Sequence, residues 1–522
     1  MLNLVATFEH SANEFPDKKA IIFQDKSFTF SQVAAMVNKV ASALKEKGIQ
    51  KGDKVALSCL NLPYFPMVYY GILKIGAVVV PLNVLLKGRE IAYHLNDSEA
   101  KAYFCFQGTP ELPMAREGFK GFNQADKCEQ FFVITADPAA ASPIDGTTTF
   151  GQLIAKASPV CDTEATEPED TSVILYTSGT TGFPKGAELS HSNMTMNAIG
   201  CRHLLQLTPD DVHAIVLPLF HSFGQTVQMN AGFSTGNTLI LIPRFTPEDV
   251  LSAIQNDGAS VFAGVPTMYW AILNFEDKED RFDFDKIANT LRVGVSGASS
   301  LPLEIIKGIE KKYNIPILEG YGMSETCPVA TFSHLTKKRK PGSIGTPIWG
   351  IEVDIFDKEN NSLGVDEVGE VVIRGHNVMK GYYNKPEATA KTIDDNNWLH
   401  SGDLGKKDAD GYFYIVDRVK DMIIRGGFNV YPREIEEVLL THPDVSLVAV
   451  LGVPHDRHGE EIAAYVVPTT GASITEEALV KWSKEQMAVY KYPRIVHLRD
   501  SLPMTATGKI LKKDLKAEIE QG

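Results

Sequence analysis

Residues 176–186 of this chain, YTSGTTGFPKG, combine hydroxyl side chains, glycines and one lysine in a short stretch. Hydroxyls and backbone N–H groups donate to phosphate oxygens, glycine lets the backbone approach an anion closely, and lysine adds a positive charge. A Walker loop requires GxxxxGK[ST], whereas here Pro184 precedes Lys185 and Gly186 follows it. We therefore predict a phosphate loop of another kind, built from Thr177, Ser178, Gly179, Thr180, Thr181, Gly182 and Lys185.

Two other segments carry side chains that suit a nucleotide. In EGYGMSET (319–326), Tyr321 can stack on a purine, and its flanking glycines allow close approach. Glu325 offers an oxygen ligand for Mg²⁺ on the nucleotide's phosphates, although a tight turn with one solvated carboxylate explains this octapeptide alone equally well. Asp403, in a Ser-Gly-Asp turn, can accept hydrogen bonds from both ribose hydroxyls, but taken alone it fits an Asx turn better.

The phosphate loop resembles that of the adenylate-forming superfamily, which includes acyl-CoA synthetases, luciferases and peptide-synthetase adenylation domains. The resemblance covers nearly the whole chain. It rests on further motifs in the family's order, namely PLFHSFG (218–224), VSGASS (295–300), EGYGMSET (319–326), WLHSGDLG (398–405), VDRVKDMIIRGGFNVYPREIE (416–436) and MTATGKI (504–510). It implies an enzyme that joins a carboxylate to the α-phosphate of ATP, releases pyrophosphate and then passes the acyl group to CoA.

The resemblance also implies roles for individual residues. Lys509 would reach the carboxylate and the α-phosphate, where a fixed positive charge stabilises the transition state between two anions. Glu325 and Thr177 would bind Mg²⁺, and Lys185 and His221 would complete the catalytic set. The other residues implied for ATP or AMP are Gly297, Ala298, Ser299, Gly320, Tyr321, Gly322, Met323, Ser324, Asp403 and Arg418.

His221 lies in an apolar segment, where a lone histidine is more often a hydrogen-bonded core residue. The resemblance places it near the acyl-adenylate, where it would shape the approach of the thiol. The acyl-binding candidates by similarity are mostly apolar or small, as an alkyl or aryl chain requires: His221, Gln225, Val265, Pro266, Thr267, Met268, Gly297 and Ala298. For the second half-reaction, the C-terminal domain would rotate about Lys420, so that Gly426 and Gly427 line a tunnel for CoA's pantetheine.

The acid substrate is less clearly indicated. Residues 217–231 include no acidic side chain, whereas peptide-synthetase adenylation domains hold the substrate's amino group with an aspartate there. Three segments are most similar in sequence to those of bacterial long-chain fatty-acid–CoA ligases, namely GVPTMY (264–269), PGSIGTP (341–347) and VMKGYY (378–383). Some of these place a tryptophan where this chain has Gln225, which leaves chain length open. A medium- or long-chain fatty-acid–CoA ligase is the leading hypothesis; an aryl or other carboxylate–CoA ligase and a non-catalytic adenylate or acyl-CoA sensor are the alternatives.

A large fold in which helices and strands alternate along the chain must position these motifs. Apolar residues in 31–48 recur every 3.6 residues and predict a helix, while 173–177 read as a strand that ends at the phosphate loop. Such alternation predicts parallel sheets covered by helices, and glycine-punctuated short strands in 342–416 predict a β-rich subdomain. We predict an α/β fold with a large domain at 1–419 and a small mobile α+β domain at 420–522.

The composition of the 522 residues, 44% hydrophobic and 22% charged, is typical of a globular protein. A net charge of −14 argues against nucleic acid, which needs a basic face. The apolar stretch 65–86 contains Lys74 and two prolines, which favours a buried helix and strand over a transmembrane segment. The six cysteines follow no metal or disulfide spacing. We expect a cytoplasmic protein that binds a carboxylic acid, ATP and CoA; peripheral membrane contact and the choice between monomer and homodimer stay open.

Overall fold

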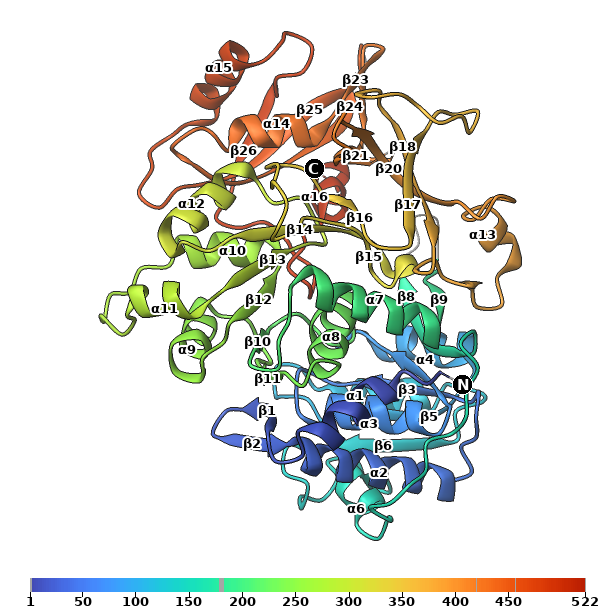
Figure 1. Ribbon diagram of the computed structural model, residues 1–522. Coiled ribbons are helices and arrows are strands. Elements are labelled where there is room, and N and C mark those ends of the chain that lie inside the picture. Colours follow the sequence, from blue (N-terminus) through green and yellow to red (C-terminus); the bar gives the residue numbers. More distant parts are fainter. Residues whose placement is uncertain (1, 178–182, 419, 456, 522) are drawn as a thin grey trace.

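The computed structural model describes residues 2–177, 183–418, 420–455 and 457–521. The chain forms a large α/β body followed by a smaller group of strands and helices at the C-terminal end (Figure 1). The predicted fold class is therefore confirmed. The predicted boundary between residues 419 and 420 stays a prediction, because residue 419 lies outside the described ranges.

The first sheet carries the stems of the phosphate loop. Its inner strands β3 to β6 run parallel to their neighbours, and β8 continues them beside β4, whereas β9 and β19 are antiparallel. The buried strands are continuous apolar runs, as expected where helices cover both faces. In order across the sheet, the strands are β19 (Gly381–Tyr382), β9 (Lys185–Ser190), β8 (Thr171–Thr177), β4 (Val78–Pro81), β3 (Lys54–Ser58), β5 (Ala100–Phe106), β6 (Gln130–Ile134) and β7 (Thr148–Thr149).

The second sheet holds the acyl and adenine motifs at the ends of its parallel strands. Its edge is completed by a hairpin near the N-terminus, which the sequence did not predict, and the first strand of that hairpin lies parallel to β11. In order, the strands are β16 (Thr346–Pro347), β15 (Val329–Phe332), β14 (Ile317–Gly322), β13 (Val293–Ser296), β12 (Val261–Gly264), β10 (Val212–Ile215), β11 (Thr238–Leu241), β1 (Lys19–Phe23) and β2 (Lys26–Thr29).

Two antiparallel sheets make up the later part of the chain. The predicted β-rich subdomain comprises β17 (Ile351–Phe356), β18 (Gly369–Gly375), β20 (Leu399–Lys407) and β21 (Phe413–Arg418). The C-terminal sheet comprises β23 (Phe428–Val430), β22 (Ile423–Arg425), β25 (Gly459–Pro468) and β24 (Val445–His455), with β26 (Ile495–Leu498) parallel to β25. Buried residues of the C-terminal sheet form hydrophobic clusters of their own.

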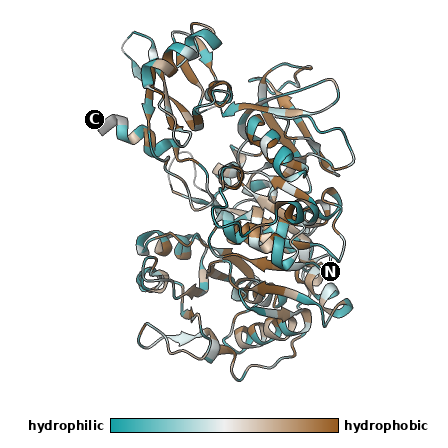
Figure 2. Cartoon of the chain, turned by 90° about the vertical axis from the view of Figure 1, so that its left-hand side faces the viewer, coloured by the Kyte–Doolittle hydropathy of each residue, from teal (hydrophilic) through white to brown (hydrophobic). Residues whose placement is uncertain are grey.

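Helices cover the sheets, and hydrophobic residues gather on the enclosed strands (Figure 2). In the large body these are α1 (Val5–Glu14), α2 (Phe30–Glu46), α3 (Tyr64–Lys74), α4 (Gly88–Asp97), α5 (Met114–Phe122), α6 (Phe150–Ile154), α7 (His191–Leu204), π-helix η1 (Phe223–Asn230), α8 (Ala231–Phe233), α9 (Pro247–Asp257), α10 (Pro266–Leu273), α11 (Phe284–Thr290), α12 (Leu303–Tyr313), 3-10 turn η2 (Ser324–Thr326) and α13 (Pro386–Ala390). The C-terminal part contains α14 (Pro432–Leu439), α15 (Glu476–Gln486) and α16 (Lys512–Gln521).

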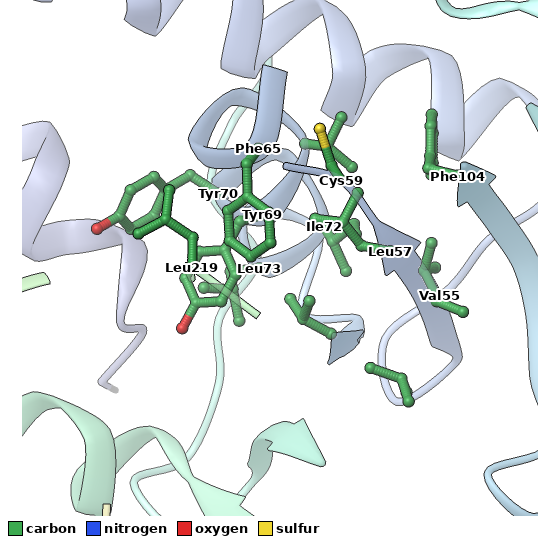
Figure 3. Packing of buried hydrophobic residues seen from close by; sticks show 14 of the residues in the cluster. Val55, Leu57, Cys59, Phe65, Tyr69, Tyr70, Ile72, Leu73, Phe104 and Leu219 are labelled. Carbon is green, nitrogen blue, oxygen red and sulfur yellow. The ribbon is translucent and has the colours of Figure 1, made fainter. Parts of the chain in front are cut away.

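The packing of α2 and α3 illustrates how the large body is held together. Helix α2 begins at a capping box between Thr29 and Gln32, and its predicted apolar stripe is buried except at Met36, which is half-buried. It lies close to α3, which requires a glycine at Gly71: a Cβ there would come within 2.5 Å of Val40 Cγ1. Side chains of α3 pack in turn against β3, where Leu57 lies near Ile72 (Figure 3). Within the described ranges, no helix is long and apolar enough to cross a membrane.

Candidate functional site

The phosphate loop is the connection of an antiparallel hairpin. Thr177, the last residue of β8, pairs with Lys185, the first residue of β9, so the two stems face each other. The hydroxyl of Thr177 lies 3.5 Å from the carbonyl oxygen of Lys185. The structure therefore brings together the predicted ends of the loop. The predictions for the five residues between them concern positions outside the described ranges, namely Ser178, Gly179, Thr180, Thr181 and Gly182.

A tyrosine that the sequence reasoning missed joins Lys185 to Glu325. The Nζ of Lys185 lies 4.2 Å from the ring centre of Tyr382, and the Tyr382 hydroxyl donates to Glu325 Oε1 at 2.8 Å. Burial, followed by the charge of Glu325, raises the pKa of Tyr382, so the phenol stays protonated and donates. Its position is set by β19, which pairs Tyr382 with Ala187 of β9. Thus Lys185 and Glu325 both contact one side chain, Lys185 over its ring and Glu325 at its hydroxyl.

A second group of predicted residues meets at Asp403. Asp403 and Arg418 are paired across β20 and β21, and Arg418 Nε lies 3.2 Å from Asp403 Oδ1. The Tyr321 hydroxyl donates to Asp403 Oδ2 at 2.7 Å. The Asp403 side chain is almost fully buried, so its negative charge is held by these two partners. The predicted purine and ribose residues therefore form one cluster.

The glycines that flank Tyr321 have a reason the sequence did not reveal. A Cβ on Gly320 would lie 2.6 Å from the Phe332 ring, and one on Gly322 would lie 1.7 Å from the carbonyl oxygen of Pro328. The backbone of Gly322 also has a φ of 156°. These glycines are required by the chain that crosses beside β14. Close approach to a purine was the predicted reason; the structure adds this packing requirement.

Lys509 reaches the large body from the C-terminal end of the chain. The preceding carbonyl, that of Gly508, accepts a hydrogen bond from Thr267 Oγ1 at 2.8 Å, so the loop docks on the predicted acyl segment. Burial, followed by the charge of Arg418, lowers the pKa of Lys509 to about 8, against the charge of Asp403, which raises it. The structure thus places Lys509 between two groups of predicted residues. One is the ribose cluster, formed by Tyr321, Asp403 and Arg418, and the other is the acyl segment around Thr267.

His221 is a neutral imidazole beside that lysine. Its Nδ1 accepts from the backbone N–H of Phe223 at 3.2 Å, which leaves the proton on Nε2. Burial lowers the pKa of His221 to about 4, and the positive charge of Lys509 acts in the same direction. The Phe223 ring lies against Gly297, where a Cβ would come within 3.1 Å of it. His221 and Gly297 therefore both lie beside Phe223, and His221 senses the charge of Lys509. Their role in acyl binding stays a prediction.

Gln225 lies on the π-helix and is fully buried. Its backbone N–H donates to the carbonyl of His221, which precedes the helix, at 3.1 Å. Neither its amide nitrogen nor its amide oxygen has a hydrogen-bond partner among the described residues. Of the remaining acyl candidates, Val265 and Met268 are buried, and Pro266 and Thr267 are half-buried.

The predicted CoA residues lie at an exposed edge of the C-terminal sheet. Gly426 and Gly427 form the turn between β22 and β23 with φ angles of 57° and 85°, and both are exposed. The neighbouring Arg425 pairs with the buried Glu461, with Nη2 and Oε2 2.9 Å apart. Its charge is therefore used within the C-terminal sheet. The predicted hinge residue, Lys420, lies in an exposed turn between β21 and β22.

Comparison with known proteins gives matches over both parts of the chain. The profile of the AMP-binding enzyme family matches residues 8–383, and that of the AMP-binding enzyme C-terminal domain matches 434–509. The chain is 35% identical to a long-chain-fatty-acid–CoA ligase from Bacillus subtilis, over 97% of this chain and 93% of the relative. It is 33% identical to a feruloyl-CoA synthase from an Amycolatopsis species, over 96% of each.

A solved structure is similar over nearly its full length. The anthranilate CoA ligase AuaEII in complex with anthranoyl-AMP has a TM-score of 0.91 at 29% identity, covering 99% of this chain and 97% of that one. These matches confirm the resemblance predicted from the motifs. The named acids differ from one relative to the next.

Proposed function

We propose that this chain, which belongs to the AMP-binding enzyme family and is an AMP-forming acyl-CoA synthetase, activates a medium- or long-chain fatty acid. The fatty-acid carboxylate would attack the α-phosphorus of ATP and release pyrophosphate, and CoA would then displace AMP to give the thioester. The long-chain-fatty-acid–CoA ligase relative supports this acid, as does the absence of acidic residues from the segment 217–231. The site residues follow from the two clusters around Glu325 and Asp403.

The first cluster would bind the pyrophosphate end of ATP. Lys185 would neutralise the β- and γ-phosphates, together with the loop that precedes it. Glu325, whose Oε1 accepts from Tyr382, and Thr177, with its hydroxyl, would hold Mg²⁺. These residues fit Mg²⁺, which takes one or two carboxylates and completes its shell with phosphate oxygens and water. When bound, the ion would neutralise charge on the phosphates. The described residues hold no group of three or more acidic, histidine or cysteine ligands, so such a site would depend on the nucleotide.

The second cluster would bind the nucleoside and the reacting carboxylate. Asp403 would accept the ribose hydroxyls with help from Arg418, and Tyr321 would lie against the purine. Lys509 would contact both the carboxylate and the α-phosphate. The hydrogen bond from Thr267 to the carbonyl of the preceding Gly508 supports this arrangement as the adenylating one. For thioester formation, the C-terminal part would rotate about Lys420 and bring Gly426 and Gly427 to the acyl-adenylate.

The alkaline limb of adenylation should report the pKa of Lys509. Because the free-enzyme pKa of this lysine is lowered to about 8, raising the pH through that value removes the positive charge. We therefore expect kcat/KM for pyrophosphate exchange to fall above about pH 8. In Lys509→Arg the guanidinium stays charged, so the residual activity should lack this limb. The same alkaline limb in both enzymes would assign it to another group.

A second candidate function is favoured by Gln225. A buried amide without partners costs about 1–3 kcal/mol, a cost that a hydrogen-bonding group on the substrate would remove. This favours an aryl or other polar carboxylate, in line with the feruloyl and anthranilate relatives. The deciding experiment is a panel of alkyl and aryl acids, each measured for ATP–pyrophosphate exchange and for CoA thioester formation. A preference for aryl acids would overturn the fatty-acid proposal, and exchange with no acid would favour a non-catalytic sensor.

Replacing Gln225 with leucine tests the role of its amide directly. Because the variant removes two unpaired polar atoms at similar volume, the free energy of unfolding should rise by about 1–2 kcal/mol. The kcat/KM for an alkyl acid should rise relative to that for a hydroxylated acid of equal length. Denaturant unfolding and paired kinetics check both results. A less stable variant with an unchanged ratio would show that the amide plays neither part.

A further inference from the structure

Helix α4 contacts the segment that leaves the phosphate loop. The Tyr93 hydroxyl donates to the carbonyl oxygen of Pro184 at 2.7 Å, immediately before Lys185. The Tyr93 ring also stacks on Phe183, with ring centres 5.1 Å apart and planes at 24°. Burial and the nearby charge of Asp97 raise the pKa of Tyr93 to about 12, so its hydroxyl stays protonated and donates. The backbone that leads into Lys185 is therefore held to α4.

The same helix contacts the segment that enters the loop. The Tyr176 hydroxyl, on the residue before Thr177, donates to Asp97 Oδ2 at 2.9 Å. The ring of His94 lies edge-on to Tyr176, with ring centres 4.4 Å apart. Tyr93 and Asp97 are four residues apart and lie on one face of α4. One face of α4 thus contacts both strands of the hairpin that carries the phosphate loop.

Asp97 extends this contact to the Glu325 cluster. Its Oδ1 accepts from Lys385 Nζ at 2.7 Å, and only 9% of its side chain is exposed. Lys385 also donates its backbone N–H to the carbonyl of Tyr382 at 3.0 Å. Tyr382, which donates to Glu325 and lies under Lys185, is therefore linked through Lys385 to the Asp97 carboxylate, which also contacts the stem of the loop. A shift of Asp97 would therefore displace both the stem of the loop and the Tyr382 segment.

We propose that Tyr93 and Asp97 are positioning residues for ATP, which hold the stems of the phosphate loop and the Tyr382 segment in register without touching the nucleotide. The proposal concerns the ATP half of the reaction, so it does not depend on which acid is used. It follows that loss of either contact should weaken use of MgATP more than it weakens thioester formation. In that second step pyrophosphate has already left the loop.

The test compares Tyr93→Phe and Asp97→Asn in the full chain. We expect KM for MgATP in pyrophosphate exchange to rise about tenfold in each, since small misplacement of binding groups is costly in rate and affinity. Thioester formation from preformed acyl-AMP should change by less than about twofold. Asp97→Glu, which keeps the charge, should recover part of the affinity. Calorimetric binding of MgATP gives the same comparison if no acid supports exchange, so failure of the acid assignment would be distinguished.

Asp211→Asn is the matched control. The side chain of Asp211 is 6% exposed, close to that of Asp97, and it forms an ion pair with Arg292 at 2.9 Å, away from the phosphate loop. This variant should lose stability without any change in KM for MgATP. The proposal is overturned if Asp97→Asn and Asp211→Asn lose similar stability and both retain wild-type MgATP affinity. Because Tyr93→Phe removes a single hydroxyl and keeps the ring, it decides the question even if Asp97→Asn fails to fold.

Discussion

Replacing Lys509 with alanine is expected to lower carboxylate-dependent ATP–pyrophosphate exchange by about 10²–10³-fold, the loss typical of removing a preorganised transition-state charge. The lysine lies between the ribose cluster and His221, where it would meet two anions at once. Lys509 is half-buried, and this burial is the main cause of its lowered pKa; partial removal from water strengthens its interaction with a substrate charge. Thioester formation from preformed acyl-AMP should be largely retained, because the bond to phosphorus is already made.

The two half-reactions must be measured on the same preparation. Lys512→Ala is the matched control, because Lys512 lies three residues further along and pairs with Glu436 at 2.7 Å within the C-terminal part. It should reduce stability while leaving the ratio of the two half-reactions unchanged. Equal loss of both half-reactions in Lys509→Ala would contradict a role confined to adenylation. It would also remove the main support for two orientations of the C-terminal part.

The sequence located residues whose chemical types are rare and concentrated in short motifs. Lys185, Glu325, Asp403 and Lys509 could be predicted as site residues because phosphate, metal and ribose binding require particular side chains among glycines. Their grouping in space was not predictable from spacing, since Lys509 meets the acyl segment only through the docking of Gly508 on Thr267. The resemblance supplied that information, and the structure provides the contacts.

Residues that orient the site escaped prediction for a different reason. Tyr382 and Asp97 are ordinary residues of a short strand and an amphipathic helix, and nothing in their local pattern distinguishes them. Their contacts depend on pairings between segments far apart in the chain, such as Asp97 with Lys385. The π-helix that carries Gln225 was missed because an apolar segment does not reveal whether its backbone bonds span four or five residues.

Asp403→Asn is the prediction that separates nucleotide binding from chemistry. Among the described residues, Asp403 is the one carboxylate that pairs with Arg418, and the substitution removes its charge. It also removes a negative charge that raises the pKa of Lys509. Arg418 is half-exposed, so the main loss is that of a charged acceptor for the ribose hydroxyls. A hydrogen bond to a charged group is worth about 1.5–3 kcal/mol, so a loss of about 10–10²-fold is expected. Because AMP stays bound through the thioester step, both half-reactions should fall together, in contrast to Lys509→Ala.

Tyr321→Phe provides the graded comparison at the same carboxylate. It removes one neutral donor at 2.7 Å and keeps the ring, so we expect a loss of about tenfold or less. The pH limb adds an independent measure: without Asp403, the pKa of Lys509 should fall further below about 8, and adenylation should decline at lower pH. If Asp403→Asn affected exchange alone and left the Lys509 limb in place, the carboxylate would have to act only before the adenylate forms. The shared ribose cluster would then not explain the second half-reaction.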